Sequence, residues 1–202
     1  PLLETVARHH SIPVENVVVG CGSTEFLQFT PWAFLKTGAG LVLPDPSYGY
    51  MAGVARRMGA IVLRVPLGPE GTIDTTAMKR AIRPDTRIVY IANPNNPTGA
   101  SVDLAAVRSL AEALPSGAIL FVDEAYHDFL PGESAVELVR AGMPVIVART
   151  FSKAYGMAGL RLGYALAPEP VMERLKEVWW GDFGINAAAR IAGPVALDDR
   201  DH

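Results

Sequence analysis

The sequence has few of the features that mark a secreted, membrane-spanning or nucleic-acid-binding protein. Its 202 residues include a single cysteine, Cys21, which excludes an intrachain disulfide and fits a reducing compartment. No apolar run approaches the roughly 20 residues that a membrane-spanning helix needs, and no signal peptide is recognisable. Basic residues are scattered along a chain of net charge −3, so no nucleic-acid patch is expected. We therefore expect a cytoplasmic globular protein that binds neither membrane nor nucleic acid.

What the chain does contain is a regular alternation of apolar strands and helical segments. Half of the residues are hydrophobic, which is enough to build a sizeable core at this length. The alternation predicts a doubly wound, three-layer α/β/α fold with a mainly parallel sheet that binds its ligand along the carboxyl edge. The expected strands lie at 17–19, 41–43, 61–65, 87–92, 118–122, 145–148 and 162–167. The expected helices lie at 1–10, from about 23, and at 51–58, 75–82, 103–114, 134–141, 168–180 and 185–197.

A lysine follows the predicted strand 145–148. Lys153 lies among small and hydroxyl residues just beyond the carboxyl end of that strand, and Arg161 follows eight residues later. A lysine held at such a strand end could be desolvated enough to act as an amine nucleophile. An ordinary surface lysine and arginine are the alternative, so the other strand ends must decide.

The predicted strand 17–19 runs into a glycine loop that opens a helix. Gly22, Ser23 and Thr24 offer backbone N–H groups and two hydroxyls at the start of that helix, which is the pattern of an anion cradle for a phosphate. A dinucleotide site fits less well, because Glu25 occupies the position of the third glycine in that fingerprint. A plain helix capped by Ser23 or Thr24 explains this segment equally well by itself.

Two rigid turns follow the next strands. Tyr48 and Tyr50 come after strand 41–43, and either ring could present a flat face to a planar ligand, although we expect one of them to pack in the core. Strand 87–92 ends in the segment 93–99, which holds three asparagines and two X-Pro steps. Such stiffness suits a binding loop that presents Asn96, but simple turn chemistry is the alternative.

An acid terminates the most apolar strand. Asp123 follows strand 118–122 and will be partly buried, where an ionised carboxylate is costly without a cationic partner. The protonated ring nitrogen of a ligand would be such a partner; an arginine salt bridge or a capping role are the alternatives. His127 has no neighbours of metal-ligand type, so no metal site is predicted.

These side chains together match one ligand. A phosphate needs the glycine loop, hydroxyls and Arg161, whereas a pyridine ring needs an aromatic face and an acid, and an aldehyde needs a lysine. The ligand that combines the three is pyridoxal 5'-phosphate. The predicted binding residues are Gly22, Ser23, Thr24, Tyr48, Asn96, Asp123, Tyr126, Thr150, Ser152, Lys153 and Arg161.

The motifs resemble those of class I/II aminotransferases of the pyridoxal-phosphate-dependent fold type I superfamily. Residues 95–99, 122–126 and 149–164 are most similar to the histidinol-phosphate aminotransferase branch, in which asparagine is often found at the position of Cys21. The resemblance implies that Lys153 binds the cofactor aldehyde covalently and moves the substrate proton.

The same resemblance implies a role for each of the other pocket residues. Asp123 would keep the pyridine nitrogen protonated, Tyr126 and Asn96 would hydrogen-bond the phenolic oxygen, and Tyr48 would stack on the ring. The catalytic set would be Lys153, Asp123 and Tyr126. The phosphate would be held by Ser23, Thr24, Thr150, Ser152 and Arg161.

The domain organisation and the activity are further implications of the resemblance. Residues 1–202 would form the cofactor-binding large domain, without the N-terminal arm and the small C-terminal domain whose arginine binds the substrate carboxylate. A homodimer would transfer an amino group between a small amino-acid donor and a 2-oxo acid or phosphorylated ketone. A decarboxylase or β-lyase on the same cofactor, and a non-catalytic cofactor-binding domain, are the alternatives.

Overall fold

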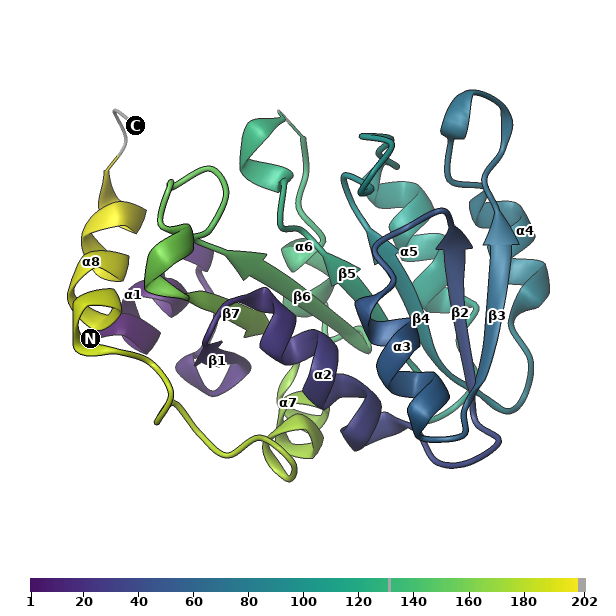
Figure 1. Cartoon of the computed structure of the whole chain (residues 1–202), viewed down its shortest axis with the longest axis horizontal. Coiled ribbons are helices and arrows are strands. Elements are labelled where there is room, and N and C mark those ends of the chain that lie inside the picture. Colours follow the sequence, from purple (N-terminus) through teal and green to yellow (C-terminus); the bar gives the residue numbers. More distant parts are fainter. Residues whose placement is uncertain (131, 200–202) are drawn as a thin grey trace.

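Seven strands form one sheet in the order β1-β7-β6-β5-β4-β2-β3 in the computed structural model, which describes residues 1–130 and 132–199 (Figure 1). β7 runs antiparallel to both of its neighbours, β6 and β1, and the other pairings are parallel. The expected mainly parallel sheet is therefore confirmed. The strands are β1 (Val17–Gly20), β2 (Gly40–Asp45), β3 (Ile61–Pro66), β4 (Thr86–Ala92), β5 (Ile119–Asp123), β6 (Val145–Thr150) and β7 (Gly163–Leu166).

Helices cover both faces of the sheet. In Figure 1, α2 (Ser23–Phe34), α3 (Tyr50–Arg57) and α7 (Glu169–Lys176) lie in front of it. The opposite face is covered by α1 (Leu2–His10), α4 (Thr75–Ala81), α5 (Leu104–Glu112), α6 (Val136–Arg140) and α8 (Ala187–Asp198). The three-layer α/β/α architecture is thus confirmed.

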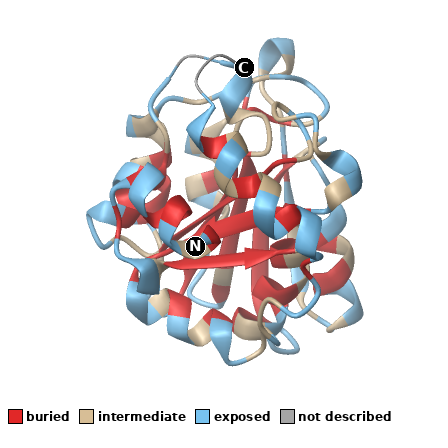
Figure 2. Cartoon of the chain, turned by 90° about the vertical axis from the view of Figure 1, so that its left-hand side faces the viewer, coloured by how far each residue is buried: buried red, intermediate tan, exposed pale blue. Residues whose placement is uncertain are grey.

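Side-chain alternation along the strands divides the core into two clusters, one on each face of the sheet. In β2, Val42 belongs to the cluster beneath α4 and α5, whereas Leu41 and Leu43 belong to the cluster beneath α2 and α3. Figure 2 shows the central strands buried between helices whose outer surfaces are exposed. No helix in the described ranges is long and apolar enough to cross a membrane.

The direction of the strands determines where the site lies. β1, β2, β4, β5 and β6 all end at one edge of the sheet, and β7 begins there. The chain between β6 and β7 forms a loop at this edge instead of a crossover α-helix, so β7 returns antiparallel. Polar residues from five separate strand ends are consequently brought together.

Helix α6 begins two residues later than expected. The Ser134 hydroxyl oxygen accepts the Val136 N–H at 3.1 Å, and the same hydroxyl donates to Glu124 at 2.8 Å. These bonds hold the residues before Val136 as a turn and anchor that turn to the end of β5.

Candidate active site

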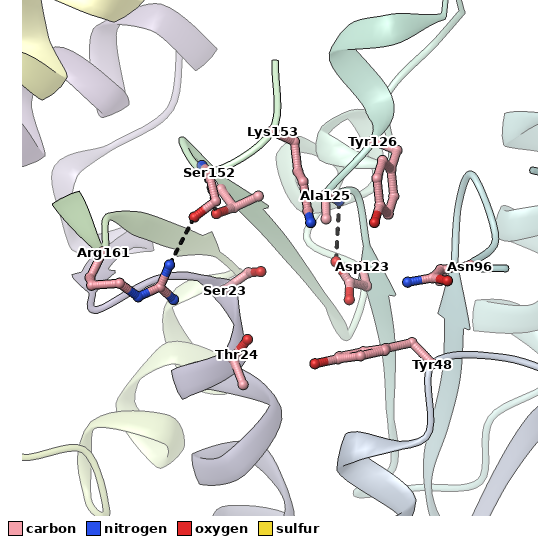
Figure 3. A pocket seen from close by; sticks show the side chains of 12 residues that line it. Ser23, Thr24, Tyr48, Asn96, Asp123, Ala125, Tyr126, Ser152, Lys153 and Arg161 are labelled. Atoms are coloured by element: carbon pink, nitrogen blue, oxygen red, sulfur yellow. Dashed lines mark hydrogen bonds between the residues drawn. The ribbon is translucent and has the colours of Figure 1, made fainter. Parts of the chain in front are cut away.

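A cavity of about 160 Å³ lies at the carboxyl edge of the sheet. Figure 3 shows side chains from both sides of this edge converging on it. The structure brings together every predicted binding residue except Gly22, which does not line the cavity but lies directly against Arg161, which does. The lining residues are Ser23, Thr24, Tyr48, Ala92, Asn96, Asp123, Ala125, Tyr126, Thr150, Ser152, Lys153 and Arg161.

Gly22 lies at the N-cap position of α2, with φ of 87°, and no side chain caps this helix. The alternative of a helix capped by Ser23 or Thr24 is therefore wrong. The Glu25 N–H donates to the Gly22 carbonyl at 3.2 Å, and the Ser23 and Thr24 N–H groups stay available to a ligand. A Cβ at Gly22 would lie 2.6 Å from Nη2 of Arg161. Only glycine satisfies both the backbone angle and this close approach.

Arg161 is held beside the start of α2 by neutral groups. Its Nη1 donates to Ser152 Oγ at 3.1 Å and to the Ala158 carbonyl at 2.9 Å, and its Nη2 donates to the Cys21 carbonyl at 3.4 Å. Within the described ranges, no carboxylate lies at ion-pair distance from this guanidinium. A fixed cation next to the free N–H groups of a helix is a site for an anion.

Gly163 is a residue of the site that the sequence analysis did not identify. A Cβ there would lie 2.5 Å from the Ser23 nitrogen and 2.8 Å from the Arg149 carbonyl oxygen. The missing side chain lets the start of β7 pass directly behind the Gly22 loop. The available signal was a glycine inside the apolar run 162–167, which indicates a close backbone approach.

Asp123 forms the floor of the cavity and is only 5% exposed. Burial raises its pKa from 3.8 to about 6, against the lowering effect of two hydrogen bonds. The Ala125 N–H donates to Oδ1 at 3.1 Å, and the Tyr90 hydroxyl donates to Oδ2 at 3.4 Å. Since no arginine pairs with this carboxylate among the described residues, the salt-bridge alternative is wrong, whereas the Ala125 bond bears out the capping alternative. The buried carboxylate still lacks a cation at ion-pair distance in the described ranges, which favours a cationic ligand.

Lys153 and Tyr126 face each other across the cavity mouth. The Lys153 Nζ lies 5.3 Å from the centroid of the Tyr126 ring, and Figure 3 shows the amine directed into the space above Asp123. The expected desolvation of this lysine is not present in the chain alone, because the loop 151–156 lies at the open rim and Lys153 is exposed.

The expectation that one of the two tyrosines packs in the core is wrong. Tyr48 is 38% exposed and Tyr50 is 36% exposed. The Tyr50 hydroxyl donates to Gln28 on α2 at 3.0 Å. The Tyr48 ring instead lines the cavity and lies below Asp123 in the view of Figure 3. Tyr48 is thus the ring that can cover a planar ligand.

The three asparagines of loop 93–99 have different roles. Asn93 exchanges two hydrogen bonds with the backbone of Val102, at 2.9 and 3.0 Å. The buried Asn95 accepts from Ser47 Oγ at 2.7 Å and donates to the Pro46 carbonyl at 3.1 Å, which ties this loop to the one carrying Tyr48. Asn96 lines the cavity (Figure 3). The turn interpretation of this loop therefore holds for Asn93 and Asn95, and the binding interpretation stays a prediction for the cavity-lining Asn96.

Comparison with known proteins gives a consistent picture. The family model "Aminotransferase class I and II" matches residues 2–192. Histidinol-phosphate aminotransferases from Maricaulis maris and Methanocella arvoryzae are 40% and 36% identical to 99% and 100% of this chain, which covers 56% and 55% of their lengths. The chain therefore spans just over half of these curated relatives.

A solved structure shows the same arrangement of elements. Histidinol-phosphate aminotransferase from Sinorhizobium meliloti, in complex with pyridoxal-5'-phosphate, superposes with a TM-score of 0.90 at 30% identity, over 99% of this chain and 55% of that one. Because the family model and the fold agree over nearly the whole sequence, the chain belongs to the class I and II aminotransferase family.

Proposed function

We propose that this chain is the cofactor-binding part of a pyridoxal-phosphate-dependent aminotransferase. The observation that carries the proposal is a buried carboxylate, Asp123, that has no cation at ion-pair distance among the described residues and lies in a cavity with the Lys153 amine on its rim. Ser23, Thr24 and Arg161 line the other end of the same cavity, with Gly22 directly against the Arg161 guanidinium. A small molecule with an aldehyde, a basic ring nitrogen and a phosphate satisfies all three groups.

The residues present fit this cofactor. Asp123 has a raised pKa, which a protonated pyridine nitrogen would lower by supplying the missing positive charge. Gly22 and Gly163 leave room for backbone and guanidinium to close around a phosphate, where a Cβ would collide. The pocket-facing Tyr48 and Asn96 offer a ring face and an amide.

The roles proposed for the chain's own residues follow from their chemistry. Lys153 would bind the aldehyde carbon through its amine nitrogen with loss of water and, once displaced by the amino group of the donor, would move the proton at the substrate's reacting carbon. When bound, the cofactor supplies an electron-withdrawing ring that stabilises negative charge on that carbon. Tyr126 and Asn96 would hold the phenolic oxygen, and Asp123 would keep the ring nitrogen protonated. Ser23, Thr24, Thr150, Ser152 and Arg161 hold the phosphate.

The proposed reaction moves an amino group between an amino acid and a 2-oxo acid or phosphorylated ketone, as in histidinol-phosphate aminotransferases. The curated relatives named above support this substrate class by their similarity. We also propose that residues 1–202 are the large domain of a cytoplasmic homodimer. In the full-length protein, an N-terminal arm and a small C-terminal domain with the carboxylate-binding arginine would complete it, in keeping with the length of those relatives.

The test uses the full-length protein saturated with pyridoxal phosphate. We expect a visible absorption band from the lysine-bound cofactor, which is lost in Lys153→Ala and kept in Lys36→Ala, a change at an exposed lysine distant in sequence from the motif. Amino donors should shift the band and yield the corresponding keto acid. A protein that shows no band would contradict the proposal, and release of carbon dioxide or ammonia without keto acid would replace the aminotransferase with a decarboxylase or a lyase.

A further inference from the structure

Two buried side chains, Arg149 and Glu124, and the exposed Asp128 form an ion cluster beside the cavity without lining it. Arg149 Nε donates to Glu124 Oε2 at 2.9 Å, and Arg149 Nη1 donates to Asp128 Oδ1 at 3.0 Å. Arg149 and Glu124 are only 5% and 1% exposed. We refer to Arg149, Glu124 and Asp128 as the Arg149 cluster.

Glu124 is held in place from every side. Its Oε2 also accepts the Ser134 hydroxyl at 2.8 Å, and its Oε1 accepts the Ala135 N–H at 2.7 Å. Its own N–H donates to the Ala148 carbonyl of β6 at 2.9 Å. The Glu124 carboxylate is therefore held in one position, and its bond to Arg149 orients the guanidinium.

Each member of the cluster is a close neighbour in sequence of a proposed cofactor-binding residue. Glu124 directly follows Asp123, Arg149 directly precedes Thr150, and Asp128 lies two residues beyond Tyr126. The cluster thus ties the ends of β5 and β6 to the short helical turn His127–Phe129. Asp128 is the turn's ionic attachment to the sheet.

Stability alone is a weak reason for such a cluster. Removing an arginine and a carboxylate from water costs several kcal/mol per ion, and well-packed apolar side chains often replace such pairs without loss. What a guanidinium adds is direction, because its planar fork fixes two acceptors at once, which the single ammonium of a lysine cannot do. The geometry of the cluster is therefore more informative than its energy.

We infer that Arg149 is a positioning residue for the active site. By holding Glu124 and Asp128 simultaneously, it fixes the turn that follows Tyr126 and so sets the Tyr126 hydroxyl relative to the Lys153 amine, whose Nζ lies 5.3 Å from the Tyr126 ring centroid. The inference rests on the proposed function, in which both groups act on the bound cofactor.

Asp128→Asn in the full-length protein tests this inference. The change keeps the shape of the side chain, removes the charge that orients the turn, and leaves the Arg149–Glu124 pair in place. We expect kcat to fall about tenfold with a smaller change in KM, since small displacements of catalytic groups cost rate. The pH midpoint of the lysine-bound cofactor band should move by about one unit, because the Tyr126 hydrogen bond to the cofactor changes. Asp128→Glu, which keeps the charge, should recover part of both effects.

Asp198→Asn is the matched control. It removes an aspartate from an exposed pair with Arg8, in which Arg8 Nη2 and Asp198 Oδ2 lie 3.5 Å apart. This variant should keep the wild-type kcat and band midpoint. An Asp128→Asn protein that is less stable but has an unchanged midpoint and kcat would overturn the inference alone. A wild-type protein that shows no cofactor band would overturn the proposed function and the inference with it.

Discussion

Asp123 and Glu124 are adjacent carboxylates at the end of the same strand, both buried, with opposite surroundings. Glu124 receives Arg149, a serine hydroxyl and a backbone N–H, all at 2.7 to 2.9 Å. Asp123 receives one N–H at 3.1 Å and one hydroxyl at 3.4 Å, and no cation pairs with it among the described residues. Because successive side chains of an extended chain point in opposite directions, Glu124 is directed toward Arg149 and Asp123 is not; among the described residues, Arg149 is the one arginine that is buried.

The difference separates a carboxylate whose partners are complete from one that can still take a ligand. A buried charge whose hydrogen-bond and ionic partners are complete gains little stabilisation from a bound ligand. A buried charge whose partners are incomplete raises the free energy of the empty protein, and a ligand of opposite charge lowers it again. The raised pKa of Asp123, set mainly by burial, is the signature of that second condition.

Replacing Asp123 by asparagine should have the largest effect. We expect transamination by the full-length protein to fall on the order of a thousandfold, since the ring nitrogen of the cofactor loses its counter-charge. The cofactor-free protein should instead become more stable at pH 8, by about 3 kcal/mol, because the amide of the new side chain cannot ionise.

The sign of that gain depends on pH. The folded pKa of Asp123, about 6, lies above the unfolded value of 3.8. Below pH 3.8 the carboxyl is protonated in both the folded and the unfolded chain, and Asp123 costs no stability. As the pH rises from 3.8 through 6, the unfolded chain ionises more readily than the folded one, so the free energy of unfolding falls. Chemical unfolding at pH 4 and pH 8 should show a gain for the variant at the higher pH alone.

Glu124→Gln is the mirror of that change. It should destabilise the protein at pH 8 by about 3 kcal/mol, since Arg149 loses its main buried partner. If both variants shift stability in the same direction, the contrast between the two carboxylates is wrong.

His10 is a third buried titratable group. Its pKa is displaced further than that of Asp123, but His10 does not line the cavity. Burial and the nearby charge of Arg149 lower its pKa from 6.5 to about 2, and its Nε2 lies 2.9 Å from the Tyr164 hydroxyl. Below pH 6.5 the unfolded chain binds a proton that the folded chain does not. The free energy of unfolding should therefore decrease as the pH is lowered below 6.5, by about 2 kcal/mol at pH 5.

His10→Gln should flatten this dependence between pH 5 and 7, because glutamine does not titrate. His9→Gln, at the exposed neighbour, should leave the slope in place. Equal slopes in the wild type and His10→Gln would show that His10 does not govern acid sensitivity. Of these two displaced groups, only Asp123 lines the cavity, so only its pKa shift supports the proposed site.

Much of the site could be predicted from the sequence because a parallel sheet brings its strand ends to one edge. Asp123, Lys153 and Asn96 each follow an apolar run, so the placement of strands also placed the side chains. The order of the residues along the chain was sufficient for this, and their contacts were not needed.

What the sequence could not reveal depends on contacts across the sheet. The sequence alone allows Arg149 to pair with either Asp123 or Glu124. It pairs with Glu124 because of the direction in which the side chains point. Gly163 matters because β7 returns antiparallel behind the Gly22 loop, and Asn95 matters because it holds a second loop. These are relations between segments far apart in the sequence; the glycine within the apolar run 162–167 indicates a close approach at Gly163 but does not identify the segment that approaches.

The smallest expected effect concerns the cradle, where Gly22 and Gly38 form a matched pair. Both have positive φ, 87° and 82°, but a Cβ at Gly22 would meet Arg161 at 2.6 Å, whereas one at Gly38 would meet nothing within 4 Å. Alanine at either position should cost about 1 kcal/mol of stability through backbone strain. Only Gly22→Ala should also weaken pyridoxal phosphate binding, by about tenfold, because the displaced guanidinium loses its contact with the phosphate. Titration of each variant with the cofactor, followed by the absorption band, measures this. Equal affinities in the two variants would mean that the close approach of Gly22 to Arg161 is not what shapes the anion site.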